Sequence, residues 1–158
     1  MKSVRDLAGR AGIVSVKGDS GTMISDISFD SRKVAPGTLF VAVRGTKSDG
    51  HDFIPAALSS GASAVICERL PENAAEGVCW ILTDDSARAL GVVASEFFGN
   101  PSSSLKLTGV TGTNGKTTIA TLLYRLFSGL GYKCGLFSTV CHYIVNKELP
   151  ATHTTPDP

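Results

Sequence analysis

The sequence predicts an α/β protein, in which short buried strands alternate with helices. The first observation is that short, continuous apolar runs at 38–43, 64–67 and 80–82 have the length and composition of strands buried on both faces. The second is that helices are predicted between the first two runs, at 53–58, and after the third run, at 84–98, where apolar residues recur at helical spacing. The third is that residues 107–118 run from an apolar segment through a Gly-rich turn into another helical stretch. This alternation is typical of α/β architecture.

The composition is that of a folded chain with no general attraction to polyanions. The 158 residues are 42% hydrophobic, enough for one medium domain or for one small domain and part of another. A formal net charge of +1 creates no field that would draw the chain to nucleic acid or anionic lipid. No apolar run approaches the roughly 18 residues of a membrane span, and residues 1–6 lack the apolar core of a signal peptide. We therefore expect no nucleic-acid or membrane partner, a cytoplasmic location and a monomer.

The four cysteines show no C-x-x-C spacing, and three of them lie within or beside apolar runs. They are therefore interpreted as buried, reduced thiols rather than as disulfide partners. The three histidines have no metal-ligand spacing either.

The elements of the first hundred residues follow from local patterns. Ser3 and Asp6 have the spacing of a capping box at the start of a short helix. Apolar and polar residues alternate over 24–29, which predicts a half-buried strand ending at the polar residues 30–32. A turn at Pro36 and Gly37 then leads into the buried strand 38–43.

A polar loop is predicted after this strand, over 44–52. Helices are predicted at 53–58 and at 84–98, the second capped by one of its first two residues, both aspartates. Strands at 64–67 and 80–82 complete the alternation.

A domain boundary is predicted at the serine run 102–104, where a Gly-Asn-Pro sequence has just ended the helix. The chain thus divides into domains 1–103 and 104–158. In the second domain we expect a strand, the Gly-rich turn, a helix ended by Gly131, and a strand at 133–140, which together form one βαβ unit. Because a lone βαβ unit cannot cover both faces of a parallel sheet, this domain is expected to be the beginning of a larger one.

A hairpin is predicted over 141–149, followed by extended backbone over 151–158.

The Gly-rich turn has the features of a phosphate-binding loop. Gly112 and Gly115 allow the backbone to approach a phosphate closely, and Lys116 supplies a cation that can reach the terminal phosphates of a triphosphate. Thr117 stands where the hydroxyl of such loops binds Mg²⁺. A turn that merely joins a strand to a helix would not require Lys and Thr directly after the last glycine.

This loop departs from the general pattern G-x-x-x-x-G-K-[ST], because Val110 stands where the first glycine belongs. The form T-G-T-N-G-K-T-T resembles the loop of the Mur ligase family, ATP-dependent enzymes that join amino acids to the cell-wall precursor. The resemblance implies ATP and Mg²⁺ as cofactors, Lys116 bridging the β- and γ-phosphates as the catalytic residue, and Thr117 holding the metal. The implied ATP-binding residues are Gly112, Thr113, Asn114, Gly115, Lys116, Thr117 and Thr118.

A second stretch resembles the N-terminal, UDP-binding domain of the same family. It is the string D-S-R-K-V-x-P-G-T-L-F-V-A-V-x-G-x-x-x-D-G-H-D-F at 30–53, followed by A-A-L-S-S-G-A-S-A-V at 56–65. Taken alone, the polar residues 30–32 and the loop 45–51 would suit a solvated turn equally well. The resemblance implies that the UDP end of the substrate is held by Phe29, Ser31, Thr46, Lys47 and Ser48.

Within the family, the residues Ser138-Thr139-Val140 and the sequence His153-Thr154-Thr155-Pro156 are most similar to one group of members. That group adds meso-diaminopimelate or L-lysine to UDP-N-acetylmuramoyl-L-alanyl-D-glutamate through an acyl phosphate, and the resemblance places His153, Thr154 and Thr155 at the muramoyl-peptide end. Members that add D-alanyl-D-alanine are the nearest alternative. The 158 residues alone are expected to be inactive, because no pocket for the incoming amine can be found.

Three other functions remain open from the sequence. The first is a P-loop kinase or GTPase, which would leave residues 1–103 unexplained. The second is folylpolyglutamate synthase, whose phosphate-binding loop is similar to this one but which lacks the D-S-R domain. A non-catalytic UDP-sugar-binding module is the third. His51 is expected to orient its loop, and His142 to lie exposed at the start of a strand.

Overall fold

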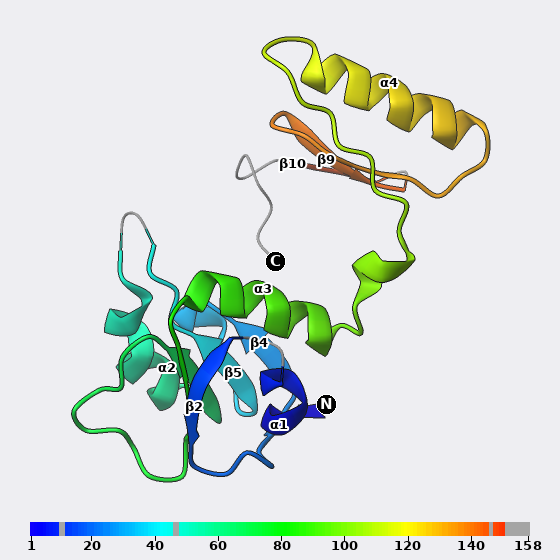
Figure 1. Cartoon of the computed structure of the whole chain (residues 1–158). Coiled ribbons are helices and arrows are strands. Elements are labelled where there is room, and N and C mark those ends of the chain that lie inside the picture. The colour runs from blue at the N-terminus through cyan, green and yellow to red at the C-terminus, as the bar shows by residue number, and fades with distance from the viewer. Residues whose placement is uncertain (10–11, 46–47, 146, 151–158) are drawn as a thin grey trace. The chain divides into compact units, whose positions relative to one another are not determined.

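The computed structural model describes residues 1–9, 12–45, 48–145 and 147–150. The chain divides into two compact units, which meet in sequence between Ser104 and Leu105 (Figure 1). We call them the N-terminal unit and the second unit and describe each separately. Their mixture of helices with parallel and antiparallel strands confirms the α/β fold class.

The N-terminal unit is built on a five-stranded sheet with the order β2-β7-β6-β5-β4. Four neighbouring strands are parallel: β4 (Asp26–Ser28), β5 (Thr38–Val41), β6 (Ala64–Cys67) and β7 (Cys79–Thr83). The edge strand β2 (Ile13–Lys17) runs antiparallel to β7, with a register shift near its start. The sequence did not predict β2, because Ser15 interrupts its apolar residues and leaves no run as long as those of the buried strands. Four of its five residues are exposed.

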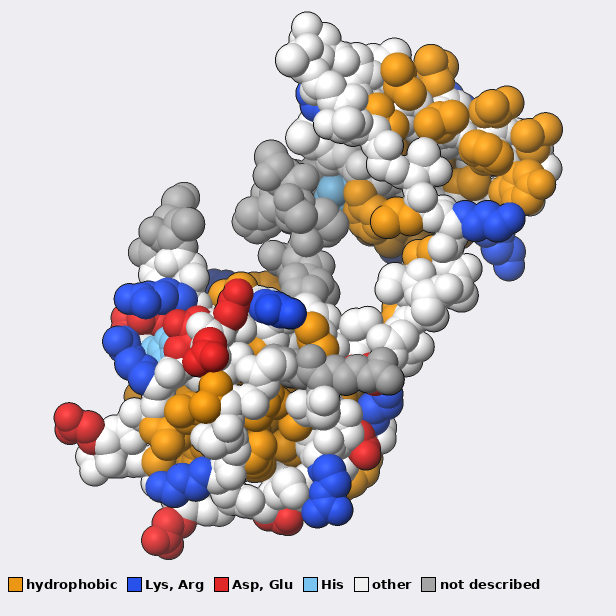
Figure 2. Space-filling view, viewed as in Figure 1, with side chains coloured by type: hydrophobic (Ala, Val, Ile, Leu, Met, Phe, Trp, Pro, Cys, Tyr) orange, Lys and Arg blue, Asp and Glu red, His pale blue; other side chains and the backbone are white. Residues whose placement is uncertain are grey.

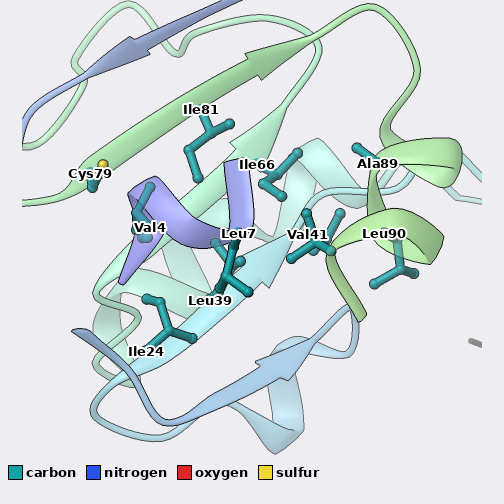
Figure 3. Close-up of a cluster of buried hydrophobic side chains, with 12 residues drawn as sticks. Val4, Leu7, Ile24, Leu39, Val41, Ile66, Cys79, Ile81, Ala89 and Leu90 are labelled. Carbon is teal, nitrogen blue, oxygen red and sulfur yellow. The ribbon is translucent and has the colours of Figure 1, made fainter. Parts of the chain in front are cut away.

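Helices cover both faces of this sheet. One face carries α1 (Val4–Ala8) and α3 (Ser86–Phe97), and the other carries α2 (Ile54–Ser59). Because side chains alternate along a strand, Val41 and its neighbour Phe40 pack on opposite faces of the sheet. Val41 packs with α1 and α3 (Figure 3), and Phe40 packs with α2. The result is a three-layer α/β structure with a hydrophobic core on each side of the sheet.

Burial explains why the central strands were predictable. Every residue of β5 and β6 is buried, as the continuous apolar runs predicted. The boundaries of α3 also agree with prediction, since Asp85 caps it by accepting the Arg88 N–H at 2.9 Å.

The half-buried strand predicted over 24–29 is divided in the structure. Its first part is β3 (Met23–Ile24), which pairs with β1 (Lys2–Ser3) in a separate two-stranded sheet, and its second part is β4. The break falls at Ser25, whose N–H donates to the carbonyl of Gly37 at 2.9 Å instead of continuing either ladder. The sequence pattern could not reveal this local competition for a hydrogen bond.

Short 3₁₀ helices follow several of these elements, at η1 (Ser31–Lys33), η2 (Gly50–Phe53) and η3 (Pro101–Ser104).

The second unit contains one long helix and an antiparallel sheet. Helix α4 (Lys116–Gly129) is followed by β8 (Gly135–Phe137), β9 (Cys141–Ile144) and β10 (Lys147–Pro150), in the order β10-β9-β8. The pairing of β9 with β10 confirms the predicted hairpin. Gly131, at φ +89°, follows the helix end as predicted. No helix in the described part of the chain is both long and apolar enough to cross a lipid bilayer.

One part of the predicted βαβ unit is not formed. Residues 106–111 adopt no strand, and Leu107 is 92% exposed. The cause is the missing neighbour: a strand exists only where another strand completes its hydrogen bonds, and the described residues of this unit offer 105–111 no such partner. Strand β8 is also shorter than the predicted 133–140.

The first prediction concerns the capping box. Ser3 Oγ accepts the Asp6 N–H at 3.2 Å, and the Asp6 carboxylate accepts the Ser3 N–H and hydroxyl at 3.3 and 2.6 Å. Ser3→Ala removes the side-chain half of this cap and should lower the free energy of unfolding by about 1 kcal/mol, measured by urea denaturation. Ser102→Ala, a Ser-to-Ala change in exposed η3, is the control, and an equal loss in both variants would contradict the assignment.

Candidate nucleotide and substrate sites

The carboxyl ends of β4, β5, β6 and β7 lie at one edge of the sheet, because these four strands are parallel. The segments that follow these strands carry polar side chains that form hydrogen bonds with one another, among them Asp30, His51 and Glu68. In open α/β sheets, ligands bind outside this edge. We call it the carboxyl edge.

Asp30 and Arg32 form a hydrogen-bonded turn directly after β4. The guanidinium donates to both carboxylate oxygens of Asp30, at 2.9 and 2.8 Å, and the Arg32 backbone N–H donates to Asp30 Oδ1 at 3.0 Å. These charge-assisted bonds lower the pKa of Asp30 from 3.8 to about 2. The turn fixes the backbone of Ser31, which lies between the two residues.

His51 connects the loop after β5 with the end of β6. Its Nδ1 lies 2.6 Å from Asp49 Oδ1, and its Nε2 lies 2.9 Å from the backbone nitrogen of Glu68. Asp49 also accepts the His51 N–H at 3.0 Å and, through its other oxygen, an Arg69 N–H at 3.1 Å. These partners lower the pKa of the Asp49 carboxyl, with the bonds from His51 as the main cause.

Glu68 extends this connection to the helix that follows β7. Its Oε1 accepts both the N–H and the hydroxyl of Ser86, at 3.1 and 2.7 Å, and these bonds lower the pKa of the Glu68 carboxyl. Ser86 is fully buried at the start of α3. The loops after three adjacent strands are thus connected by side-chain hydrogen bonds.

A cavity of about 220 Å³ lies within this group of charges, lined by Arg44, Asp49, His51, Glu68 and Arg69. Figure 2 shows acidic and basic side chains gathered around a histidine on the N-terminal unit. Because two guanidinium groups and two carboxylates line it, the cavity suits a polar group better than an apolar one.

The structure places the predicted UDP-end residues on this edge as far as it describes them. Phe29, which is 44% exposed, and Ser31 follow β4, while exposed Ser48 belongs to the loop after β5. Thr46 and Lys47 lie outside the described residues. The sequence interpretation missed Glu68 and Ser86, although an acidic residue directly after a buried strand is a usable signal.

In the second unit, the Gly-rich loop leads into the N-terminus of α4. Gly115 is the N-terminal cap with φ +76°, and Gly112 has φ +143°; both values are unfavourable for residues with a Cβ. Lys116 Nζ folds back and donates to the carbonyls of Gly112 and Thr113, the second at 3.0 Å. The ammonium therefore lies over the loop.

The start of α4 has the properties that a phosphate group requires. The Ile119 N–H donates to the Gly115 carbonyl at 2.9 Å, so the N–H groups of 116–118 precede the first intrahelical bond. Gly115 has no side chain to accept them. These donors, the helix dipole and the Lys116 charge all favour an anion.

The predicted muramoyl-peptide residues and His142 remain to be placed. His153, Thr154 and Thr155 lie outside the described residues. His142 is buried in β9 against the ring of Phe137, so its predicted exposure is wrong; no local pattern indicated that β8 and β9 would enclose it. No cluster of three or more His, Cys, Asp or Glu that could hold a metal occurs in the described ranges.

The fold and the loop first indicate a class of protein, an α/β protein whose second unit begins with a Gly-rich loop and a helix N-terminus suited to a phosphate group. Comparison with known families then gives a specific match. The "Mur ligase family, catalytic domain" matches residues 23–98, and the "Mur ligase middle domain" matches residues 110–158. The chain belongs to the Mur ligase family.

Curated relatives and solved structures agree with this family. A "UDP-N-acetylmuramoyl-L-alanyl-D-glutamate--2,6-diaminopimelate ligase" of Cytophaga hutchinsonii is 55% identical over 155 residues, which are 98% of this chain and 32% of the relative. The enzyme of the same name from Bacteroides thetaiotaomicron is 54% identical over 145 residues, 92% of this chain and 30% of the relative. The chain therefore spans about a third of the length of these relatives.

Among solved structures, a diaminopimelate ligase of the same name has a TM-score of 0.68 at 27% identity, covering 98% of this chain and 31% of that one. A MurF ligase from Thermotoga maritima, solved in complex with ADP, has a TM-score of 0.52 at 40% identity, covering 68% of this chain and 24% of that one.

The second prediction concerns the pKa of Asp30. Because its folded value of about 2 lies below its ordinary 3.8, the ionised carboxylate stabilises the turn at neutral pH, and this stabilisation is lost as the pH falls through about 2. Carboxyl carbon NMR shifts followed against pH should show this titration. Arg32→Leu should move the pKa of Asp30 toward 3.8, whereas Lys33→Ala, which removes the charge that lowers it least, should move it little. A pKa of Asp30 unchanged by Arg32→Leu would refute the guanidinium as the cause of the low value.

Proposed function

We propose that the protein containing these residues is an ATP-dependent ligase that adds 2,6-diaminopimelate to UDP-N-acetylmuramoyl-L-alanyl-D-glutamate. The observation that carries the proposal is the 55% identity to a ligase of that name, which extends over both units of the chain. The proposal concerns the whole protein, and the 158 residues alone are expected to be inactive, as the sequence indicated. Neither D-alanyl-D-alanine nor L-lysine is proposed as the added group, because the two relatives described above are named for diaminopimelate.

The second unit is proposed to bind ATP. Residues 112–118 offer free backbone N–H groups, a glycine cap and the Lys116 ammonium, a combination that fits a chain of phosphates. ATP supplies the phosphoryl group that activates the substrate carboxylate, and Lys116 would stabilise the charge on the transferring phosphate. Mg²⁺ is proposed to contact the Thr117 hydroxyl, since a hard cation takes oxygen ligands and shares its site with phosphate oxygens.

The N-terminal unit is proposed to bind the UDP end of the substrate at the carboxyl edge. Phe29 offers an exposed ring for the base, and Ser31 and Ser48 offer hydrogen-bond donors for the ribose or diphosphate. Thr46 and Lys47 complete the proposed set. Domains 1–103 and 104–158 would thus divide the two substrates between them, with His153, Thr154 and Thr155 assigned to the muramoyl peptide. A cytoplasmic location and a monomeric state remain part of the proposal, and the four free cysteines are consistent with a reducing compartment.

The third prediction tests the ATP site. Lys116→Ala removes charge-assisted hydrogen bonds to phosphate and should weaken ATP binding at least about tenfold, measured by isothermal titration calorimetry. Lys133→Ala removes an equal charge beyond the end of α4, and its ATP affinity should stay close to that of the unmodified chain. Equal affinities of the Lys116 variant and the unmodified chain would exclude the proposed role.

The fourth prediction tests the UDP site, using amide NMR spectra of the 158-residue chain. UDP should shift the amide signals of Ser31 and of residues 46–48 and leave the signals of 112–118 largely in place, because the base contacts the N-terminal unit. ATP should shift the signals of 112–118. If UDP shifts only the loop of the second unit, the chain has a general nucleotide site and the substrate assignment fails.

A further inference from the structure

The hydrogen-bonded side chains at the carboxyl edge have no part in the function proposed above. We propose that His51 and Glu68 are positioning residues, which hold residues 48–52 of the loop after β5 in one arrangement and thereby prepare Ser48 for the UDP end of the substrate. The proposal rests on the UDP site proposed above, but its structural part can be tested without a ligand. We call Asp49, His51, Glu68 and Ser86 the edge network.

The tautomer of His51 follows from its partners. Its Nε2 faces the Glu68 backbone N–H at 2.9 Å, and an N–H can only donate, so Nε2 must be the unprotonated acceptor. The ring proton therefore lies on Nδ1, which donates to Asp49 Oδ1 at 2.6 Å. With its side chain only 6% exposed, the neutral ring is a fixed bridge with one defined direction.

Glu68 continues the bridge from β6 to α3. Its backbone N–H holds His51, while its carboxylate holds the buried Ser86 through two hydrogen bonds. The Ser86 hydroxyl also accepts the Arg44 backbone N–H at 3.4 Å. This weaker hydrogen bond joins α3 to the loop after β5. The network therefore joins the loop to the two neighbouring strand ends.

The backbone fixes the same loop at both of its ends. The Gly50 N–H donates to the Val43 carbonyl at 2.9 Å, and the Gly45 N–H donates to the Ser48 carbonyl at 3.0 Å. A Cβ on Gly50 would lie 2.5 Å from the Val43 carbonyl oxygen, so the backbones approach too closely for any other residue. Loop ends already held in this way lose little conformational entropy when a ligand binds, which increases affinity.

None of the four network residues needs to touch the ligand for this effect. The network acts on Ser48, a proposed UDP contact, through its sequence neighbour Asp49, which His51 and Arg69 hold. Loss of one contact in the network should therefore reduce UDP affinity even though the residues proposed to contact UDP remain.

Two variants of His51 separate its contacts. An asparagine side chain has the length to reach Asp49 from the Nδ1 position but not Glu68, and glutamine has the length to reach Glu68 from the Nε2 position. If the complete bridge is required, His51→Asn and His51→Gln should each weaken UDP binding about tenfold, as expected for the loss of one buried hydrogen bond to a charged or fixed partner.

Glu68 provides a rescue experiment. Glu68→Gln keeps an acceptor oxygen for Ser86 and should bind UDP within about threefold of the unmodified chain, whereas Glu68→Ala should lose about tenfold. Ser3→Ala is the stability control, because it weakens the same unit at α1 and does not touch the carboxyl edge. UDP affinity that falls equally in Ser3→Ala would show that lost stability, rather than lost positioning, is the cause.

Two measurements test, without UDP, whether His51 positions the loop. Imidazole nitrogen NMR shifts of the unmodified chain should report a neutral ring protonated at Nδ1, and hydrogen exchange of the Gly50 amide should be faster in both His51 variants. If the unmodified chain does not bind UDP, the proposed UDP site fails while these measurements still decide whether His51 positions the loop. An Nε2-protonated or rapidly averaging ring, unchanged Gly50 exchange, or unchanged UDP affinity in the His51 variants would overturn the proposal.

Discussion

Parallel backbone pairing of β4, β5, β6 and β7 is the constraint on which the N-terminal unit depends. It requires strands that are buried on both faces, and the sequence meets this with continuous apolar runs. It also brings four strand ends, and the loops that follow them, to one edge of the sheet. Residues as distant in sequence as Asp30 and Ser86 therefore lie at the ends of strands in the same sheet, and the polar chemistry of the unit gathers where the core ends.

The two units arrange candidate anion sites in different ways. The N-terminal unit uses side chains from several loops, and their mutual hydrogen bonds fix the geometry. The second unit uses one continuous segment, in which Gly115 and the start of α4 present backbone N–H groups and Lys116 adds a charge. Because the whole chain has a formal net charge of only +1, both sites depend on local donors rather than on a general positive field.

Local patterns predicted the elements whose stability is decided locally or by burial. The buried strands β5 and β6, the cap of α3 at Asp85 and the glycine after α4 all fall in this group. Elements that depend on a partner distant in sequence were not predictable: β2 exists because β7 accepts it, and residues 107–110 form no strand because no described strand pairs with them. The edge network was not predictable either, because it also depends on partners distant in sequence. The spacing of His51 and Glu68 in the sequence does not show that their loops meet.

The two edge strands of the five-stranded sheet have a consequence for the behaviour of the chain during folding. An exposed, long and flat edge can template a strand from another molecule and so begin aggregation. Here β4 has only three residues before the turn at Asp30, and β2 has an irregular register near Ile13 and ends at Lys17. Short length, local irregularity and a terminal charge each discourage intermolecular pairing. These features matter most at β2, because its exposed Val14 and Val16 would otherwise offer an apolar edge to other copies of the chain.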